Sequence, residues 1–115
     1  MRVLIVDDHP SFRTCARAVL ESEGYEVVGE AANGEEAVRA AAELQPDLVL
    51  VDVGLPDFSG FEVAERLAAL DHAPAVILTS SRDQSDYGSS ITDSGARGFI
   101  PKADLSVDAL ALLLK

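Results

Sequence analysis

The side chains in this sequence that could carry chemistry stand directly after short apolar runs. They are three acids, two hydroxyls and a lysine: Asp7, Asp8, Asp52, Thr79, Ser80 and Lys102. If these side chains meet in space, the three carboxylates repel one another, and a divalent cation with hard oxygen ligands such as Mg²⁺ relieves that repulsion. An ammonium and a hydroxyl aimed at the same point suit phosphoryl transfer with an Asp nucleophile. We therefore predict a magnesium site beside a phosphoryl acceptor, and Asp52 is the candidate acceptor.

The apolar runs that precede these residues are predicted strands. Four of them, 3–6, 48–51, 75–78 and 98–100, are continuous apolar stretches, which is typical of strands covered on both faces in a parallel sheet. The segment 25–30 is more polar and is predicted to be an edge strand. Because parallel strands present their carboxyl ends at one edge of the sheet, the residues that follow the strands are expected to lie close together.

Apolar residues at helical spacing separate the predicted strands. The spacing is clear in segments 12–20, 37–44, 61–68 and 107–114. Between 84 and 95 only Tyr87 and Ile91 are large and apolar, and the surrounding Gly, Ser, Thr and Asp are poor helix formers, so we expect a short or distorted helix there. The alternation predicts one α/β domain over residues 1–115, a (βα)5 arrangement with a doubly wound parallel five-stranded sheet.

The composition excludes several classes of function. Nine Lys and Arg against twenty Asp and Glu give a net charge of −11, which opposes direct binding to nucleic acid or to an anionic membrane. No apolar run reaches the roughly 20 residues that span a bilayer. Cys15 is the single cysteine, so an internal disulfide is impossible, and we expect it to be a small buried hydrophobe. These features predict a soluble cytoplasmic protein.

The ordered set of motifs resembles the receiver domain of bacterial two-component response regulators over residues 2–114. The motifs are VLIVDDHP at 3–10, DLVLVD at 47–52 with Leu55, Pro56 and Gly60 behind it, VILTS at 76–80, and GFIPK at 98–102. This resemblance implies a flavodoxin-like strand order of 2-1-3-4-5. It also implies a conformational switch that accepts a phosphoryl group from a sensor histidine kinase or phosphotransfer protein, not an enzyme that turns over a small substrate.

The same resemblance assigns the acceptor and the metal ligands. Asp52 would be the phosphoacceptor, and Asp8, Asp52 and the backbone carbonyl of Gly54 would bind Mg²⁺ directly. Asp7 would act on the cation largely through water. Gly54 and Ser81 occupy the two positions that influence hydrolysis of the acyl phosphate in this family, and neither carries a long side chain. The lifetime of the phosphorylated state is therefore left open.

The switch residues are also implied by the resemblance. Lys102 would pair with one phosphoryl oxygen, and Thr79 would hydrogen-bond another. Phe99, three residues before Lys102, matches the aromatic residue that changes rotamer together with Thr79. Ser80 is a departure, because this position often carries alanine in such domains, but serine is still small enough to leave room for a phosphoryl group.

Two other classes of protein use similar residues. A haloacid-dehalogenase-type phosphohydrolase also has an Asp nucleophile, but it needs a second carboxylate two residues later, where this chain has Gly54 and places its next acid at Asp57. The chain is also short for that class. A flavodoxin-like FMN binder needs Gly, Ser and Thr after the first strand, where Asp7 and Asp8 stand.

Several of these residues also have purely structural interpretations. Asp7 and Asp8 could cap a helix that begins at Pro10, and Phe99 could simply pack in a core. His9 stands beside the acids, but one imidazole without a second nitrogen or sulfur ligand is a poor transition-metal site, so we interpret it as a surface or capping residue. The combination of residues at one edge, more than any one of them, favours a functional site.

A surface for partners is predicted on the last helix. With the apolar stripe of 107–114 placed inward, Leu105 and Leu112 point outward, which suggests a homodimer or the docking of another domain. The sequence fits both a stand-alone receiver and the N-terminal part of a regulator with a helix-turn-helix DNA-binding output domain absent from this chain. It identifies neither the kinase nor the stimulus.

Overall fold

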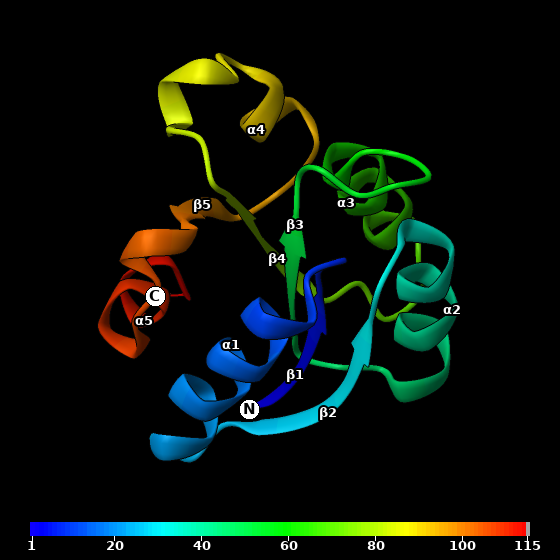
Figure 1. The fold of residues 1–115 in the computed structure, drawn as a ribbon. Helices are drawn as coiled ribbons and strands as arrows, with labels where there is room; N and C mark the ends of the chain where they lie inside the picture. Colours follow the sequence, from blue (N-terminus) through cyan, green and yellow to red (C-terminus); the bar gives the residue numbers. More distant parts are fainter. Residues whose placement is uncertain (115) are drawn as a thin grey trace.

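The computed structural model describes residues 1–114, and at its centre lies a five-stranded parallel sheet (Figure 1). The strands are β1 (Arg2–Val6), β2 (Glu26–Ala31), β3 (Leu48–Asp52), β4 (Ala75–Ser80) and β5 (Gly98–Pro101). Their order, β2-β1-β3-β4-β5, confirms the predicted 2-1-3-4-5 topology. Every residue of β3 is buried, whereas β2 at the edge is mostly half-buried or exposed, as its more polar sequence predicted.

Helices connect the strands. Within residues 1–114 they are α1 (Pro10–Ser22), α2 (Gly34–Leu44), α3 (Gly60–Ala68), α4 (Ser90–Asp93) and α5 (Val107–Leu114). The local sequence explains the helix ends. Pro10 occupies the first turn of α1, and the side chains of Asn33 and Ser59 accept backbone N–H groups at the starts of α2 and α3. Gly24, in the left-handed region with a φ of 87°, follows the end of α1.

Both faces of the sheet are covered, so the protein has two cores. Helices α1 and α5 pack on one face, and α2, α3 and α4 pack on the other (Figure 1). Successive residues of β1 alternate between the two cores: Val3 and Ile5 face α1 and α5, and Leu4 and Val6 face the opposite layer. This arrangement confirms the doubly wound α/β fold.

Two predictions about single side chains are wrong. Cys15 is exposed, because α1 turns Ala16 and Leu20 toward the sheet and leaves Cys15 on the solvent side. Leu105 is half-buried and packs against the core that lies between the sheet and helices α1 and α5. It precedes α5 in an extended conformation, so the helical rotation used to place it outward does not apply. Leu112, inside α5, is 69% exposed as predicted.

The segment 84–95 contains little helix, as its sequence predicted. A 3-10 turn covers Gln84–Asp86, and α4 is only four residues long. Ile91 is the buried residue of α4, and the half-buried Tyr87 packs against the same core. Two apolar anchors therefore hold this segment to the domain.

Candidate functional site

The predicted site residues lie together at the carboxyl edge of the sheet. Asp52 is the last residue of β3, and its register partner on β4 is Thr79. Asp7 follows β1 directly, and Lys102 follows β5 at the start of a 3-10 turn. The parallel topology thus brings together residues that are far apart in the sequence.

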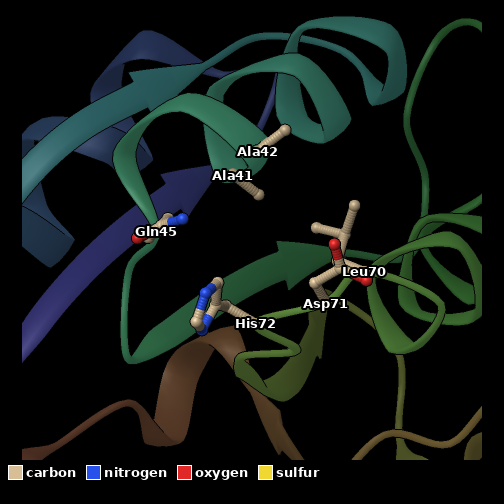
Figure 2. A pocket seen from close by; sticks show the side chains of 6 residues that line it. All are labelled: Ala41, Ala42, Gln45, Leu70, Asp71 and His72. Carbon is tan, nitrogen blue, oxygen red and sulfur yellow. The ribbon is translucent and has the colours of Figure 1, made fainter.

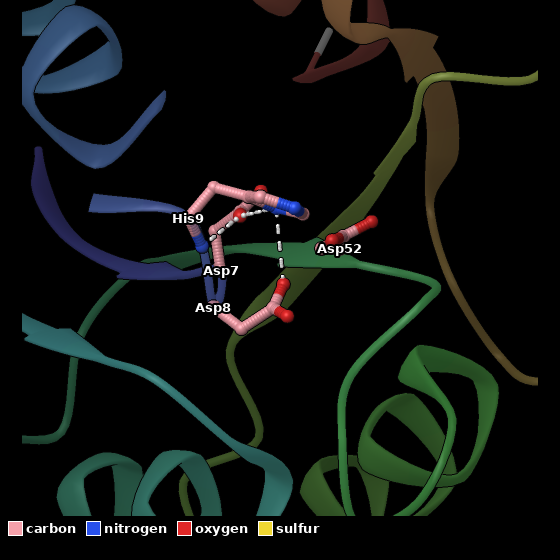
Figure 3. A group of neighbouring side chains, drawn as sticks. All are labelled: Asp7, Asp8, His9 and Asp52. Atoms are coloured by element: carbon pink, nitrogen blue, oxygen red, sulfur yellow. Dashed lines mark hydrogen bonds and ion pairs between the residues drawn. The ribbon is translucent and has the colours of Figure 1, made fainter. Parts of the chain in front are cut away.

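Three carboxylates and one imidazole form an acidic cluster, which we define as Asp7, Asp8, His9 and Asp52. Figure 3 shows the loop after β1 carrying the first three residues beside Asp52 of β3. Each residue offers one ligand atom, and these atoms lie within 4.8 Å of one another. Carboxylates this close repel one another, and hard oxygen donors suit a cation such as Mg²⁺, so the residues present fit a divalent cation.

His9 lies over two of the acids. Its backbone N–H donates to Asp7 Oδ1 over 2.8 Å, and its Nδ1 lies 3.0 Å from that oxygen and 3.1 Å from Asp8 Oδ1. The same residue occupies the N-cap position of α1, and its side chain is 63% exposed. His9 is therefore a surface residue at a helix start, as predicted, and its backbone and ring both help to orient Asp7.

Lys102 provides the positive charge at the site. Its Nζ lies 2.6 Å from Asp7 Oδ2, 3.3 Å from Asp52 Oδ2 and 4.7 Å from the centre of the Phe12 ring. Burial lowers the pKa of Lys102, but the hydrogen bonds and charges of Asp7 and Asp52 outweigh burial and raise the pKa above its ordinary value. The ammonium therefore stays charged at neutral pH.

Asp52 carries its negative charge in an unfavourable environment. Burial raises the pKa of its carboxyl, and the charge of Asp7 raises it further. Lys102 and the backbone N–H of Gly54, which donates to Asp52 Oδ1 over 3.2 Å, lower the pKa but do not cancel the increase. Further positive charge at this edge would stabilise the ionised form of Asp52.

Thr79 places an unsatisfied hydroxyl beside Asp52. The residue is 1% exposed, and its Oγ1 has no hydrogen-bond partner among residues 1–114. A buried hydroxyl without a partner costs about 1–3 kcal/mol, so an oxygen-rich group arriving at Asp52 would gain a ready donor. A phosphoryl group on Asp52 fits both this hydroxyl and the Lys102 ammonium.

An aromatic cluster adjoins the site, formed by Phe61, Tyr87 and Phe99. The Tyr87 ring lies 5.4 Å from the Phe61 ring and 5.7 Å from the Phe99 ring, between ring centres. The Tyr87 hydroxyl hydrogen-bonds Ser80 Oγ over 2.6 Å. Sequence reasoning treated Tyr87 only as an apolar anchor and missed this polar contact. The serine at position 80 was the one signal that could have indicated it.

The loop after β3, residues 53–59, passes close to the acceptor. A Cβ added at Gly60, where α3 begins, would collide with the backbone oxygen of Asp52, so glycine is required there. Gly54 is exposed, and a Cβ at that position would contact nothing nearby. The predicted role of Gly54 thus rests on its backbone carbonyl and not on its lack of a side chain.

A pocket of about 160 Å³ lies elsewhere, between the end of α2 and the loop after α3 (Figure 2). It is lined by Ala41, Ala42, Gln45, Leu70, Asp71 and His72. Gln45 precedes β3 and His72 precedes β4, so the pocket lies at the amino edge of the sheet. It therefore takes no part in the chemistry at the carboxyl edge.

The fold and this edge define a phosphoacceptor domain of the signalling type. The family model described as "Response regulator receiver domain" matches residues 3–113, so the chain belongs to that family. It is a receiver domain with a flavodoxin-like fold, and its place in signalling is that of a phosphoacceptor switch.

Relatives of known sequence and structure agree with this assignment. The chain is 40% identical over 101 residues to the transcription regulator BvgA of Bordetella pertussis, covering 88% of this chain and 48% of BvgA. It is 33% identical over 104 residues to the DNA-binding transcriptional activator EvgA of Escherichia coli, covering 90% and 51%. The signal receiver domain of NarL from Mycobacterium tuberculosis is 30% identical, with a TM-score of 0.87 over 98% of this chain and 95% of that one. The chain spans about half the length of the curated relatives it matches.

Proposed function

We propose that Asp52 of this receiver domain accepts a phosphoryl group in a Mg²⁺-dependent reaction. One observation carries the proposal: the buried Asp52 carboxylate belongs to the acidic cluster, lies 3.3 Å from the Lys102 ammonium, and has the unpartnered Thr79 hydroxyl on its register partner. Asp8, Asp52 and the Gly54 carbonyl would hold Mg²⁺, with Asp7 acting through water. The bound cation would supply positive charge that neutralises the carboxylates and the phosphoryl oxygens.

The donor in this proposal is a phosphohistidine on a sensor kinase or phosphotransfer protein. One carboxylate oxygen of Asp52 attacks the phosphorus, the P–N bond breaks, and its electron pair returns to the imidazole nitrogen. The product is an acyl phosphate on Asp52. Lys102 then pairs with one phosphoryl oxygen, and the hydroxyl of Thr79 donates to another. Both groups start close to the acceptor, because Lys102 Nζ lies 3.3 Å from Asp52 Oδ2 and Thr79 is the register partner of Asp52.

The proposed switch begins at Thr79 and Phe99. In the switch that the receiver resemblance implies, Phe99 changes rotamer when Thr79 turns toward the phosphoryl group. Phe99 contacts Tyr87, so the change reaches the segment 84–95 and the face formed by α4, β5 and α5. Because that segment contains so little helix, a signal of a few kcal/mol is enough to shift its population.

The remaining features of the proposal concern context. We propose that the domain turns over no small substrate and undergoes only its own phosphorylation and slow hydrolysis. We further propose that it serves a cytoplasmic regulator with a DNA-binding output domain, since BvgA and EvgA are transcription regulators of about twice the matched length. Homodimerisation stays a prediction. No helix among residues 1–114 is both long and apolar enough to cross a membrane.

The experiment is phosphorylation with a small donor. Incubation with Mg²⁺ and acetyl phosphate should add one phosphoryl group to the wild type, and Asp52→Asn should abolish the addition while the circular dichroism spectrum stays unchanged. Asp104→Asn, at an exposed acid in the turn after β5, is the matched control and should be phosphorylated normally. Equal phosphorylation of Asp52→Asn and wild type in intact-mass spectra would refute the assignment.

The alternative of a haloacid-dehalogenase-type phosphohydrolase has no support from the comparisons. It also predicts a different result when a phosphate monoester replaces acetyl phosphate. Such an enzyme would release many equivalents of inorganic phosphate from the monoester, whereas a receiver domain would leave the monoester intact.

A further inference from the structure

We propose that Asp57 is a positioning residue for the phosphoacceptor site, because its carboxylate ties the 53–59 loop to the first turn of α2. The inference rests on the proposed function, since it concerns the Gly54 carbonyl that would bind the cation. Sequence reasoning considered Asp57 only as the wrong spacing for a phosphohydrolase. In the structure the Asp57 carboxylate connects the 53–59 loop to the start of α2.

The Asp57 carboxylate accepts three backbone N–H groups, two from the first turn of α2 and one from its own loop. Asp57 Oδ1 accepts from Gly34 N over 2.8 Å and from Phe58 N over 2.9 Å, and Asp57 Oδ2 accepts from Glu35 N over 3.0 Å. Desolvation raises the pKa of Asp57, but these hydrogen bonds outweigh it and lower the pKa overall. The first N–H groups of a helix have no partner inside the helix, so a carboxylate from another element can cap them.

A packing contact holds the same two elements together. A Cβ added at Gly34 would lie 2.5 Å from the Phe58 ring, so the loop sits directly on the start of α2. The Arg66 guanidinium also lies over the Phe58 ring, 4.2 Å from the ring centre. Phe58 and Asp57 therefore fix the loop at neighbouring positions.

The loop is held at the acceptor end as well. Gly54 N donates to Asp52 Oδ1, and Val53 N donates to the Thr79 carbonyl over 2.9 Å. Only Leu55 and Pro56 lie between these anchors and Asp57. A segment this short has few conformations when both of its ends are fixed. Loss of the Asp57 contact would increase that number, so the Gly54 carbonyl and the Asp52 carboxylate would become more mobile. Mg²⁺ demands near-ideal octahedral geometry and tolerates such movement poorly.

The experiment compares two variants that weaken the same end of α2. Asp57→Ala removes the contact between loop and helix. Asn33→Ala removes the helix's own cap, in which Asn33 Oδ1 accepts from Glu36 N over 2.9 Å, and leaves the loop contact intact. Titration calorimetry with Mg²⁺ alone should show about tenfold weaker binding for Asp57→Ala, the size typical of groups that orient metal ligands. Asn33→Ala should bind Mg²⁺ like the wild type.

Two further measurements separate positioning from general stability. Asp57→Asn keeps an oxygen that can accept one N–H, so it should restore part of the lost affinity. Gly34→Ala keeps the Asp57 carboxylate but pushes the Phe58 ring away from the start of α2, so it should also weaken Mg²⁺ binding, by displacing the loop. In the metal-free protein, amide hydrogen exchange at 53–59 should become faster in Asp57→Ala and stay unchanged in Asn33→Ala.

The outcomes distinguish this inference from the proposed function. Wild-type protein that fails to bind Mg²⁺ would overturn the metal site itself. Normal wild-type binding, with the same affinity in Asp57→Ala or equal losses in Asp57→Ala and Asn33→Ala, would overturn only the positioning role. Unchanged exchange at 53–59 in Asp57→Ala would do the same.

Discussion

The substitution Asp8→Asn should stabilise the metal-free protein and reduce the stability that the protein gains on binding Mg²⁺. Asp8 belongs to the acidic cluster, in which the ligand atoms lie within 4.8 Å of one another. Lys102 contacts Asp7 and Asp52, whereas the one ion pair of Asp8 among residues 1–114 is with His9. Asp8 is therefore the least compensated carboxylate, and asparagine removes its charge while keeping its shape.

The size of the effect follows from Coulomb's law. Two unit charges 4.8 Å apart repel by about 3.5 kcal/mol at an effective dielectric constant of 20 and by about 0.9 kcal/mol in bulk water. The Asp8 side chain is 32% exposed, so water screens the repulsion, and Lys102 offsets a further part. We expect a net gain of about 1–2 kcal/mol in the free energy of unfolding, or roughly 4–8 °C in Tm.

Urea unfolding in EDTA and in Mg²⁺ provides the assay. A cation that binds only the folded state adds about 2.7 kcal/mol at a hundred times its Kd, so Mg²⁺ should make the wild type the more stable protein and reverse the order. Glu65→Gln, at an exposed acid of α3, measures the relief of the overall charge of −11. If Asp8→Asn gains no more than Glu65→Gln in EDTA, the repulsion within the cluster is not what destabilises this edge.

Two other predictions concern hydrogen bonds away from the acidic cluster. Tyr87→Phe removes the bond to Ser80 and should lower the free energy of unfolding by about 1 kcal/mol, with faster amide exchange across 84–95; unchanged exchange would show that the aromatic packing alone holds that segment. Partial burial raises the pKa of Glu30, but hydrogen bonds from two arginines of α1 outweigh burial and lower the pKa overall. The stabilisation from Glu30 is therefore present above the unfolded pKa and is lost as the pH falls through the folded pKa. Wild type should be more stable than Glu30→Gln at pH 7, by less than about 1 kcal/mol. Urea titrations should show this difference disappearing between pH 7 and pH 3.

The fold was predictable because its signals are local and repeated. Each buried strand is a continuous apolar run, and each clear helix has an apolar stripe and a recognisable start or stop, such as Asn33, Ser59 or Gly24. The strand order came from the resemblance to receiver domains. The sequence also predicted that 84–95 would form little helix, because the residues there are poor helix formers and have only two apolar anchors.

The site was predictable at the level of residue types but not of contacts. Position after a strand placed Asp7, Asp52 and Lys102 at one edge. It did not indicate that Lys102 lies closer to Asp7 than to Asp52, since that depends on side-chain conformations across three strands. Leu105 was misplaced for a related reason, because a helical rotation was applied to a residue outside the helix. The sequence did not indicate the contact of Asp57 with α2, because the two are more than twenty residues apart and residue spacing reports only neighbours along the chain.

In the proposed switch, the link between Asp52 and the face formed by α4, β5 and α5 depends on two adjacent residues of β4. Side chains alternate along a strand, so Thr79 and Ser80 point to opposite sides of the sheet. Thr79 stands beside Asp52 with an unsatisfied hydroxyl, and Ser80 holds Tyr87, whose ring covers Phe99. In the proposed switch, any shift of β4 toward a phosphoryl group moves both side chains at once. Such a shift therefore displaces Tyr87 through its hydrogen bond to Ser80. With alanine at position 80, only the packing of the Tyr87 and Phe99 rings would connect β4 to the segment 84–95.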